Sequence, residues 1–453
     1  MKRSIRPPSR RYKRAFAPNL SRGQNYSYDS RVLPFDMSEE AYNVSVESGA
    51  LEAGYGAEST DISARYGMVY YYRTYDEQSE TYSGHLIAYD SLSGKTGVLR
   101  GGEWSEIQGA EFASPPVGTN YRLYGEDVYL LCGDEGMAVV HPDFRAVTVS
   151  SAPKITSVAM HNERMFVTVG GRRNAVWFSD DLNPTNWNPE LDEGGFIELE
   201  GDGGKLNKAV AFGGYVYLFR DYGIARLTAY GDQSEFSVTN LFVSGGKIYG
   251  DTALVCGDRI MFLAAGGLYS FDGVSAVRVC EGLSGLFERF SEPVACYHCG
   301  KYFIASGEYL AVIDARTKIV SVSKGMEILS FSPIAGEDGE QLLACVKGGE
   351  TLGKIVLGAD VFGVKQKRLW RGGMTDLGSP ESRKLITDAY INSKYDCVLS
   401  VRTERGQKSV RIKGGAGVRR KRINLLGTMA GIEITAEGEL SAARPALRYT
   451  VVN

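Results

Sequence analysis

The densest group of metal-ligand residue types in this chain is the segment Cys296-Tyr-His-Cys299, with two thiols and His298 within four residues. Such a segment supplies half of a structural zinc site, which takes four ligands, usually from two Cys/His pairs. No second pair stands elsewhere in the sequence. The run from Val294 to Phe303 instead predicts a strand with Cys296 and His298 on one face. We therefore expect no metal and no other cofactor.

The remaining histidines and the known catalytic motifs give no catalytic residue. His85, His141 and His161 stand singly, and we interpret each as a surface or hydrogen-bonded strand residue. The sequence has no HExxH, no Walker loop, no GxSxG and no dinucleotide fingerprint after a strand. A non-enzymatic protein is the prediction.

The segment Ser179-Asp-Asp-Leu-Asn-Pro-Thr-Asn-Trp187 raises the question of glycan chemistry. It is close to the Asp box of sialidase-type proteins, a Ser-x-Asp-x-Gly-x-x-aromatic turn. Here Asn183 replaces the glycine, Trp187 comes one residue late, and there is one copy. Glycan cleavage needs paired carboxylates, or a Tyr nucleophile with Arg groups for an anionic sugar. A carbohydrate-binding or sialidase-like glycan-cleaving protein is therefore the alternative function.

The same segment has a structural interpretation. A strand ends near Ser179, the Asn183-Pro184 pair turns the chain, and Trp187 folds back to cover the sheet edge. We interpret Ser179, Asn183, Pro184 and Trp187 as residues of a structural turn.

The elements that position these residues repeat along the chain. A Gly- or Asn-bearing turn followed by an apolar strand recurs about every 37 to 51 residues, beginning at Gly125, Asn162, Gly213, Gly257, Cys299 and Gly339. With 55 Gly, 27 Tyr and 18 Phe in 453 residues, this pattern predicts short strands and tight turns. A period near 40–45 residues is typical of a β-propeller. A pair of β-sandwiches is the other interpretation of such spacing.

We therefore predict an all-β fold in three parts. Residues 1–30 form an extended basic arm, residues 31–375 a six- or seven-bladed β-propeller with lead-in strands, and residues 376–453 a small C-terminal β-sandwich. The last part is expected because strict apolar–polar alternation replaces the longer repeat after Trp370-Arg-Gly-Gly373.

Charge is unevenly distributed although the net charge is only −3. The first 24 residues carry eight cations and no acid, which leaves −11 for the rest; these cations are Lys2, Arg3, Arg6, Arg10, Arg11, Lys13, Arg14 and Arg22. The arm could contact phosphates of DNA or lie across an acidic neighbouring subunit, and we favour the subunit. A second run is either the solvated face of sandwich strands or a contact with a lumen or a partner; it contains Arg402, Arg405, Lys408, Arg411, Lys413, Arg419, Arg420, Lys421 and Arg422.

The sequence also bears on compartment. It has no run of 18 apolar residues, and Ala15-Phe-Ala-Pro-Asn19 is too short and polar for the apolar region of a signal peptide. Seven scattered cysteines fit reduced thiols better than disulfides. We expect the protein to be made and kept in the cytoplasm, or in something assembled there.

Three segments carry a resemblance to a known family. Val176-Trp-Phe-Ser-Asp-Asp-Leu-Asn-Pro-Thr-Asn-Trp187 resembles an aromatic-Ser-x-x-x-(Asn/Asp)-Pro-x-x-Trp turn of propeller proteins in tailed-phage virions. Gly266-Gly-Leu-Tyr-Ser-Phe-Asp-Gly273 is similar to a blade hairpin of those proteins, and Trp370-Arg-Gly-Gly373 followed by Lys384 resembles their C-terminal region. The family is the phage nozzle, or tail tubular protein B, group.

The resemblance implies a non-enzymatic virion protein of the neck or tail. Members form a ring, commonly hexameric, below the portal and adaptor, where they continue the DNA conduit and dock other tail proteins. It implies homo-oligomerisation, contact with a head–tail connector and other tail proteins, and transient contact with genomic DNA. The lack of an 18-residue apolar run separately predicts no membrane segment. A scaffold of the WD-repeat kind is a weaker possibility, because the repeated Trp-Asp and Gly-His signature is absent.

Overall fold

The computed structural model describes residues 13–18, 20, 23–27, 33, 37–100, 103–171, 174–191, 194–336 and 339–452. The chain divides into two compact units. We call residues 57–318 and 325–355 the propeller unit, and residues 1–56, 319–324 and 356–453 the terminal unit. No helix of the described ranges is both long and apolar enough to span a membrane.

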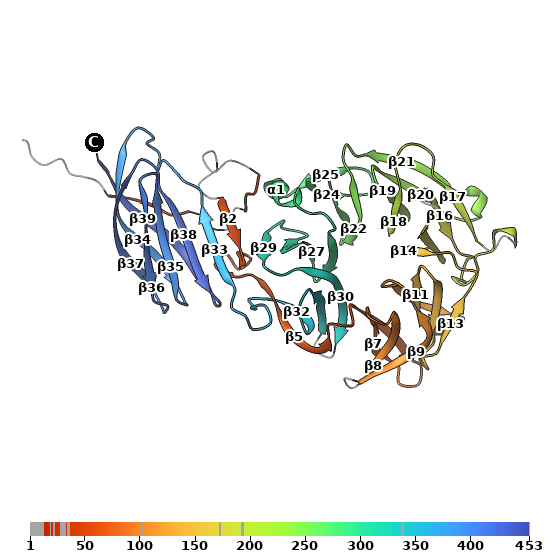
Figure 1. Ribbon diagram of the computed structural model, residues 1–453. Helices are drawn as coiled ribbons and strands as arrows, with labels where there is room; N and C mark the ends of the chain where they lie inside the picture. Colours follow the sequence, from red (N-terminus) through yellow and green to blue (C-terminus); the bar gives the residue numbers. More distant parts are fainter. Residues whose placement is uncertain are drawn as a thin grey trace, which may run out of the picture. The chain divides into compact units, whose positions relative to one another are not determined.

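In the described ranges of the propeller unit, antiparallel sheets of four strands follow one another along the chain (Figure 1). The first two are β6 (Met68–Asp76), β7 (Thr81–Tyr89), β8 (Lys95–Arg100) and β9 (Glu103–Glu111), then β10 (Val117–Leu123), β11 (Glu126–Gly133), β12 (Gly136–Val140) and β13 (Ala146–Val149). The next two are β14 (Ile155–His161), β15 (Arg164–Val169), β16 (Ala175–Phe178) and β17 (Gly195–Glu198), then β18 (Leu206–Phe212), β19 (Tyr215–Arg220), β20 (Gly223–Thr228) and β21 (Ser237–Val243).

The rest of the propeller unit continues the series. A further sheet contains β22 (Ile248–Cys256), β23 (Arg259–Ala264), β24 (Gly267–Phe271) and β25 (Ala276–Val279), and is followed by the short helix α1 (Ser284–Phe287). Next come the paired strands β26 (Val294–His298), β27 (Lys301–Ser306) and β28 (Tyr309–Asp314). The last sheet contains β30 (Ile328–Gly336), β31 (Gly339–Val346), β32 (Thr351–Leu357) and, from far earlier in the chain, β5 (Tyr55–Ser63).

The series of sheets closes on itself. The first strand of each sheet lies beside the first strand of the next, and β30 of the last sheet lies beside β6 of the first. Because β5 completes the last sheet, the beginning and end of the unit are joined by backbone hydrogen bonds. The chain is an all-β protein of the propeller type. The prediction of that fold is confirmed, and these sheets are compatible with the expected six or seven blades.

Local sequence explains the strands and their turns. Each repeat start predicted at Gly125, Asn162, Gly213, Gly257 and Cys299 falls in the hairpin between the first two strands of its sheet. At Cys299-Gly300 both turn residues have positive φ, 46° and 76°, as a two-residue type I′ hairpin requires. The second strands are nearly continuous apolar runs because both faces of each sheet are covered by neighbouring sheets.

The buried clusters lie between successive sheets. One cluster joins Phe166 and Val176 of one sheet to Val216 and Leu218 of the next. Burying one such side chain contributes about 1.5–3 kcal/mol to the free energy of unfolding. A single four-stranded sheet cannot bury these side chains without a neighbouring sheet. The packing of each sheet therefore depends on its two neighbours.

The terminal unit contains two sheets in its described part. One runs β2 (Ser38–Tyr42), β33 (Lys367–Gly372), β38 (Gly431–Glu437), β35 (Cys397–Thr403) and β36 (Gly406–Ile412). The other runs β29 (Val320–Lys324), β3 (Val44–Ser45), β4 (Leu51–Ala53), β39 (Ser441–Val452), β34 (Arg383–Ser393) and β37 (Val418–Gly427), with β1 (Lys13–Phe16) also on β39. Trp370 and Ile434 of the first sheet share one buried cluster with Ile391 and Leu447 of the second.

This arrangement corrects two predicted boundaries. Residues 13–16 are not a separate arm, because they pair with β39, and Leu20 is buried in the terminal core. The lead-in strands β2–β4 and the strand β33 belong to the terminal unit and not to the propeller. A local alternation pattern predicts a strand but does not name its partner, which explains both errors. Lys2, Arg3, Arg6, Arg10, Arg11 and Arg22 lie outside the described residues, as does the side chain of Lys13.

Candidate functional site

A pocket of about 720 Å³ opens where the first strands of the propeller sheets converge. Met68 on β6, Lys208 on β18, Asp251 on β22, Val294 on β26 and Phe331 on β30 all line it. A pocket lined by first strands of successive sheets lies where those strands surround the propeller axis. This is where propellers and other closed β-folds commonly hold ligands.

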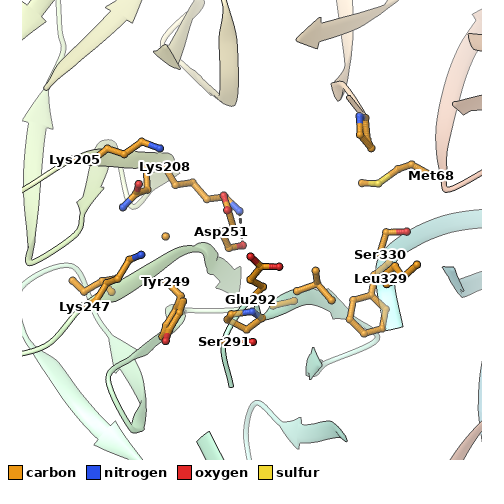
Figure 2. A pocket seen from close by; sticks show the side chains of 18 residues that line it. Met68, Lys205, Lys208, Lys247, Tyr249, Asp251, Ser291, Glu292, Leu329 and Ser330 are labelled. Atoms are coloured by element: carbon orange, nitrogen blue, oxygen red, sulfur yellow. Dashed lines mark hydrogen bonds between the residues drawn. The ribbon is translucent and has the colours of Figure 1, made fainter. Parts of the chain in front are cut away.

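The pocket carries both signs of charge. Lys205, Lys208 and Lys247 line it together with Asp251 and Glu292. In Figure 2 Lys205 and Lys247 occupy one side of the pocket, and the apolar Met68 lies on the opposite side. A group of ammonium ions in a recess attracts an anionic ligand, and carboxylates beside them limit the net positive charge.

Lys208 is the most perturbed of these lysines. Desolvation lowers the pKa of its ammonium, and the negative charge of Asp251 offsets part of that effect. The side chain itself is half-buried. Its Nζ donates a 3.0 Å hydrogen bond to the backbone oxygen of Asp251, which connects β18 to β22 across two sheets. Lys208 therefore joins two sheets as well as charging the pocket.

The predicted structural turn joins two sheets of the propeller unit. The hydroxyl of the buried Ser179 accepts a 3.0 Å hydrogen bond from the Met165 N–H and donates to the Asp180 carbonyl. Asn183 accepts from the Thr185 N–H at 3.0 Å and donates from Nδ2 to the Tyr124 hydroxyl at 2.9 Å. These bonds hold the loop after β16 against the hairpin of the preceding sheet.

Trp187 and Pro184 complete that turn. Trp187 is only 3% exposed and packs with Val128 and Leu130 of one sheet and Val167 of the next, and Pro184 is buried. The side chain covers the interface between sheets. None of the four turn residues lines the axial pocket.

The Cys296–Cys299 segment is arranged differently from the half zinc site considered above. Cys296 is buried, burial raises the pKa of its thiol to about 12, and its Sγ lies 3.6 Å from the Tyr297 carbonyl oxygen. His298 and Cys299 instead lie beside Glu340. Glu340 was missed by sequence reasoning because it follows 41 residues later in the neighbouring sheet, with no local signal. Each of the seven cysteines is a free thiol.

The other histidines have local structural contacts. His141 Nδ1 lies 2.8 Å from a carboxylate oxygen of Glu126, and His85 Nε2 lies 3.1 Å from the Thr74 hydroxyl. His161 packs against Phe166. Burial lowers the pKa of both His85 and His161.

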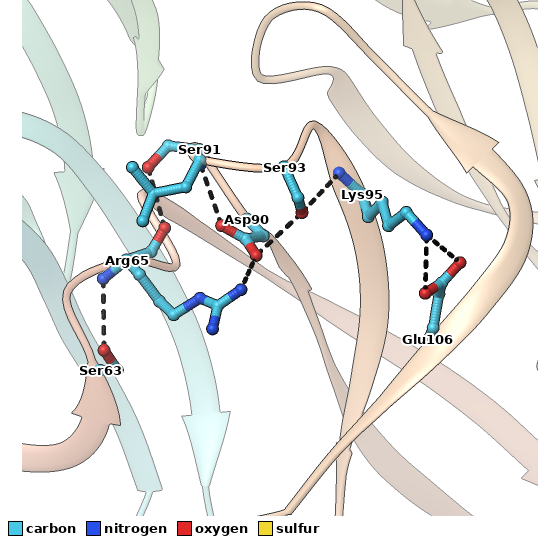
Figure 3. Close-up of polar contacts among 8 residues, drawn as sticks. Ser63, Arg65, Asp90, Ser91, Ser93, Lys95 and Glu106 are labelled. Atoms are coloured by element: carbon cyan, nitrogen blue, oxygen red, sulfur yellow. Dashed lines mark hydrogen bonds and ion pairs between the residues drawn. The ribbon is translucent and has the colours of Figure 1, made fainter.

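A second polar cluster in the propeller unit is structural (Figure 3). The carboxylate of the buried Asp90 accepts hydrogen bonds from the Arg65 guanidinium, the Leu92 N–H and the Ser93 hydroxyl. Burial by itself would raise the pKa of Asp90, but these hydrogen bonds outweigh it and hold the pKa at about 2. The cluster fixes the turn after β7, where Lys95 also pairs with Glu106 at 2.9 Å.

The second basic run forms an exposed edge of the terminal unit. Strands β36 and β37 are the last strands of their two sheets and lie beside each other, and Lys408 Nζ donates a 2.7 Å hydrogen bond to the Ile423 carbonyl. We define the basic edge as Lys408, Arg411, Lys413, Arg419, Arg420, Lys421 and Arg422. Six of them are exposed and Lys421 is half-buried.

The cations of this second basic run differ in their ion pairs and in their exposure. Arg420 of the basic edge pairs with Asp388 at 2.8 Å. Arg402 is half-buried away from the edge, where it pairs with Glu39 at 2.8 Å. The run therefore combines a solvated face with cations held in ion pairs, among them Arg402 and Arg420.

Charge is segregated between the two units. By sequence, the terminal unit has 28 Lys and Arg against 15 Asp and Glu, a net charge of +13. The propeller unit has 23 against 39, a net charge of −16. The near-zero total of −3 is thus the sum of two strongly and oppositely charged bodies. The predicted contrast between arm and body understated this segregation.

No family model matches the chain, and no curated protein matches it in sequence. Among solved structures, it is similar to virginiamycin B lyase from Staphylococcus aureus, with 10% identity over 68% of this chain and 99% of that chain and a TM-score of 0.42. It is similar to the WD40 domain of Neurospora crassa Pan2, with 11% identity over 60% and 85% and a TM-score of 0.39.

A third similar structure is the extracellular domain of a hybrid two-component system from B. thetaiotaomicron. Identity is 10%, coverage is 82% of this chain and 47% of that chain, and the TM-score is 0.43. Likeness at this level concerns the β-propeller fold alone. It assigns no ligand and no reaction to this chain.

Proposed function

We propose that this protein is a non-enzymatic structural subunit of a tailed-phage neck or tail, whose copies form a nozzle-like ring. In the virion such a ring continues the DNA conduit and docks the neighbouring tail proteins. The phage assignment rests on the resemblance of the 176–187 turn and the two later segments. The ring rests on a separate observation, the segregation of charge between the two units.

Opposite charge on two units of one chain favours contact between copies. A terminal unit at +13 attracts the propeller unit of another copy at −16, and such a contact uses two different surfaces. Contacts of this head-to-tail kind generate closed rings when the rotation between copies divides the circle. Charge complementarity also speeds encounter and excludes like-charged orientations.

The charge of the basic edge favours contact through side chains over backbone pairing between edge strands of two copies. Strands β36 and β37 end their sheets and could add further strands. Exposed Lys and Arg on an edge strand oppose pairing with the similarly charged edge of another copy. An acidic surface of a neighbouring propeller unit does not meet that repulsion.

Genomic DNA is the other polyanion that a conduit protein meets. The exposed cations of the basic edge suit transient phosphate contacts, each releasing counterions. The acidic propeller unit would repel DNA, so a ring passes the genome without holding it. Contact of the basic edge with a neighbouring subunit and contact with DNA predict different partners in binding assays.

Electron microscopy and light scattering of the purified protein test the proposal. At low ionic strength we expect closed rings with one uniform subunit number, and mass spectrometry should find the protein in purified virions. A protein that stays monomeric at every concentration and salt, and is absent from virions, would overturn the proposal.

The lining of the axial pocket favours a second candidate function, a carbohydrate-binding or glycan-cleaving protein. Asp251 and Glu292 are carboxylates, and Tyr249 is aromatic, as a glycan site requires. The Tyr249 hydroxyl already donates to the Phe290 carbonyl at 3.3 Å. If this function holds, the protein releases reducing sugar from glycans, and Asp251→Asn and Glu292→Gln abolish the release.

A further inference from the structure

Two neighbouring sheets of the propeller unit bring a histidine, a cysteine and a glutamate together. His298 ends β26, Cys299 forms the turn into β27, and Glu340 is the second residue of β31. His298 Nε2 lies 3.3 Å from Cys299 Sγ, and Cys299 Sγ lies 3.5 Å from Glu340 Oε2. All three ligand atoms lie within 4.8 Å of one another.

These separations match those between the ligands of one tetrahedral metal ion. Zinc lies about 2.0–2.1 Å from imidazole nitrogen and about 2.3 Å from thiolate sulfur. At a tetrahedral angle these bond lengths place the nitrogen and the sulfur about 3.5 Å apart, and the same holds for sulfur and carboxylate oxygen. The observed distances of 3.3 and 3.5 Å match these two separations, and the third pair, His298 and Glu340, lies within 4.8 Å.

The backbone positions the three groups independently of one another. The Cys299-Gly300 pair makes a type I′ turn, and the antiparallel pairing of His298 with Lys301 places the turn at the end of its hairpin. Glu340 comes from a different hairpin, opposite Ala335 on β30. Because β26 and β30 are adjacent, the two hairpins meet.

We propose that His298, Cys299 and Glu340 bind one divalent zinc ion between the two sheets. An imidazole, a thiolate and a carboxylate together suit zinc, whereas magnesium and calcium prefer oxygen ligands alone. Cys299 and Glu340 are exposed and His298 is half-buried, so the ion has access from solvent. Three protein ligands leave the fourth tetrahedral position for a water molecule.

Zinc binding replaces a proton in this cluster. In the structure the Cys299 thiol donates to Glu340. When the sulfur–zinc bond forms, the S–H bond breaks and its proton passes to the buffer, while the His298 and Glu340 lone pairs complete the site. No electron is transferred, and about one proton is released for each zinc bound.

The test is metal titration of the full chain after chelator treatment. Calorimetry should give one zinc per chain with micromolar or tighter affinity, and heats in two buffers should report the released proton. Cobalt should give the thiolate-to-metal absorption band and the visible bands of a four-coordinate site, and magnesium should give neither binding nor bands. Zinc should also raise the melting temperature, because it binds only the folded arrangement.

Variants identify the ligands. Cys299→Ser should abolish the thiolate-to-cobalt band, and both Cys299→Ser and Glu340→Gln should weaken zinc binding at least about tenfold. Cys280→Ser, at a half-buried thiol outside the cluster, is the matched control and should bind as the unaltered protein does. Circular dichroism checks that each variant is folded.

Either of two results would overturn the proposal. One is an unaltered protein that takes up no stoichiometric zinc. The other is zinc affinity and a cobalt spectrum that survive Cys299→Ser, which would place the metal elsewhere. Neither result depends on whether the protein forms rings.

Discussion

The hydroxyl of Tyr302 on β27 donates a 2.8 Å hydrogen bond to the backbone oxygen of Thr252 on β22, in the preceding sheet. Tyr302 is fully buried, so the bond forms inside the packed interface between two sheets. Two other tyrosines donate in the opposite direction, to the following sheet: Tyr72 to the Asp127 carbonyl at 2.6 Å and Tyr217 to the Gly273 carbonyl at 3.1 Å. In each case the tyrosine ring fills the apolar interface, and its hydroxyl donates a hydrogen bond to a carbonyl group of the adjacent sheet.

Tyr302→Phe should destabilise the propeller unit by about 1–2 kcal/mol, because the buried Thr252 carbonyl loses its partner while the packing is kept. Chemical denaturation measures the change. Tyr222→Phe, at a tyrosine that is 45% exposed, is the control and should be neutral. Equal effects of the two substitutions would show that the bond contributes nothing.

Alkaline pH should weaken the same interface. Burial raises the pKa of Tyr302 well above its ordinary value of 10.0. The folded protein therefore retains a proton that the unfolded chain loses, so the stability is full below pH 10 and falls as pH rises above it. In a series of denaturation curves at increasing pH, Tyr302→Phe should show a shallower decline than the unaltered protein. If the stability of both proteins fell equally with rising pH, deprotonation of Tyr302 would not be the cause.

Asp90→Asn should destabilise the propeller unit by about 2 kcal/mol, because the charged acceptor of the Arg65, Leu92 and Ser93 hydrogen bonds is lost. The folded pKa of Asp90 is about 2, below its ordinary 3.8. This stabilisation is present above pH 3.8 and is lost as pH falls towards 2. Acid titration of stability should therefore be flatter for Asp90→Asn across that window.

Ser179→Ala should cost about 1–3 kcal/mol, because the buried Met165 N–H loses its acceptor. Trp187→Ala should cost about 3–5 kcal/mol by leaving a cavity between two sheets. Thermal melts measure both, with the exposed Ser114→Ala as the neutral control. If both variants were as stable as Ser114→Ala, the structural interpretation of this turn would be wrong.

Charge reversal at the basic edge should disrupt ring formation. The double variant Arg419→Glu and Arg422→Glu should weaken self-association about tenfold or more, and raising the salt should weaken it in the unaltered protein. The matched control reverses Arg383 and Lys365, which are exposed cations of the same unit away from the edge. Sedimentation at several salt concentrations measures both. Equal losses would mean that net charge, and not the edge, drives assembly.

The repeat was predictable because its signals are local. Gly125, Asn162 and Gly213 mark hairpins since each turn requires a backbone conformation that glycine and asparagine adopt readily. The apolar run after each turn is a second strand covered on both faces. The local part of the structural turn was predictable for the same reason, since Ser179 donates to Asp180 and Asn183 accepts from Thr185. These features determined the all-β propeller class.

What the sequence could not determine is which distant segments meet. The strand β5 completes the last propeller sheet, and β1 pairs with β39 more than 400 residues away, although each is only an extended segment when considered alone. The same limit hid Glu340 beside Cys299 and the collection of lysines at the axial pocket. A strand's own residues determine its faces, but its hydrogen-bonding partner depends on how the whole chain closes. Only the tertiary structure decided these contacts, because strand pairing and charge grouping arise between residues that the chain order keeps apart.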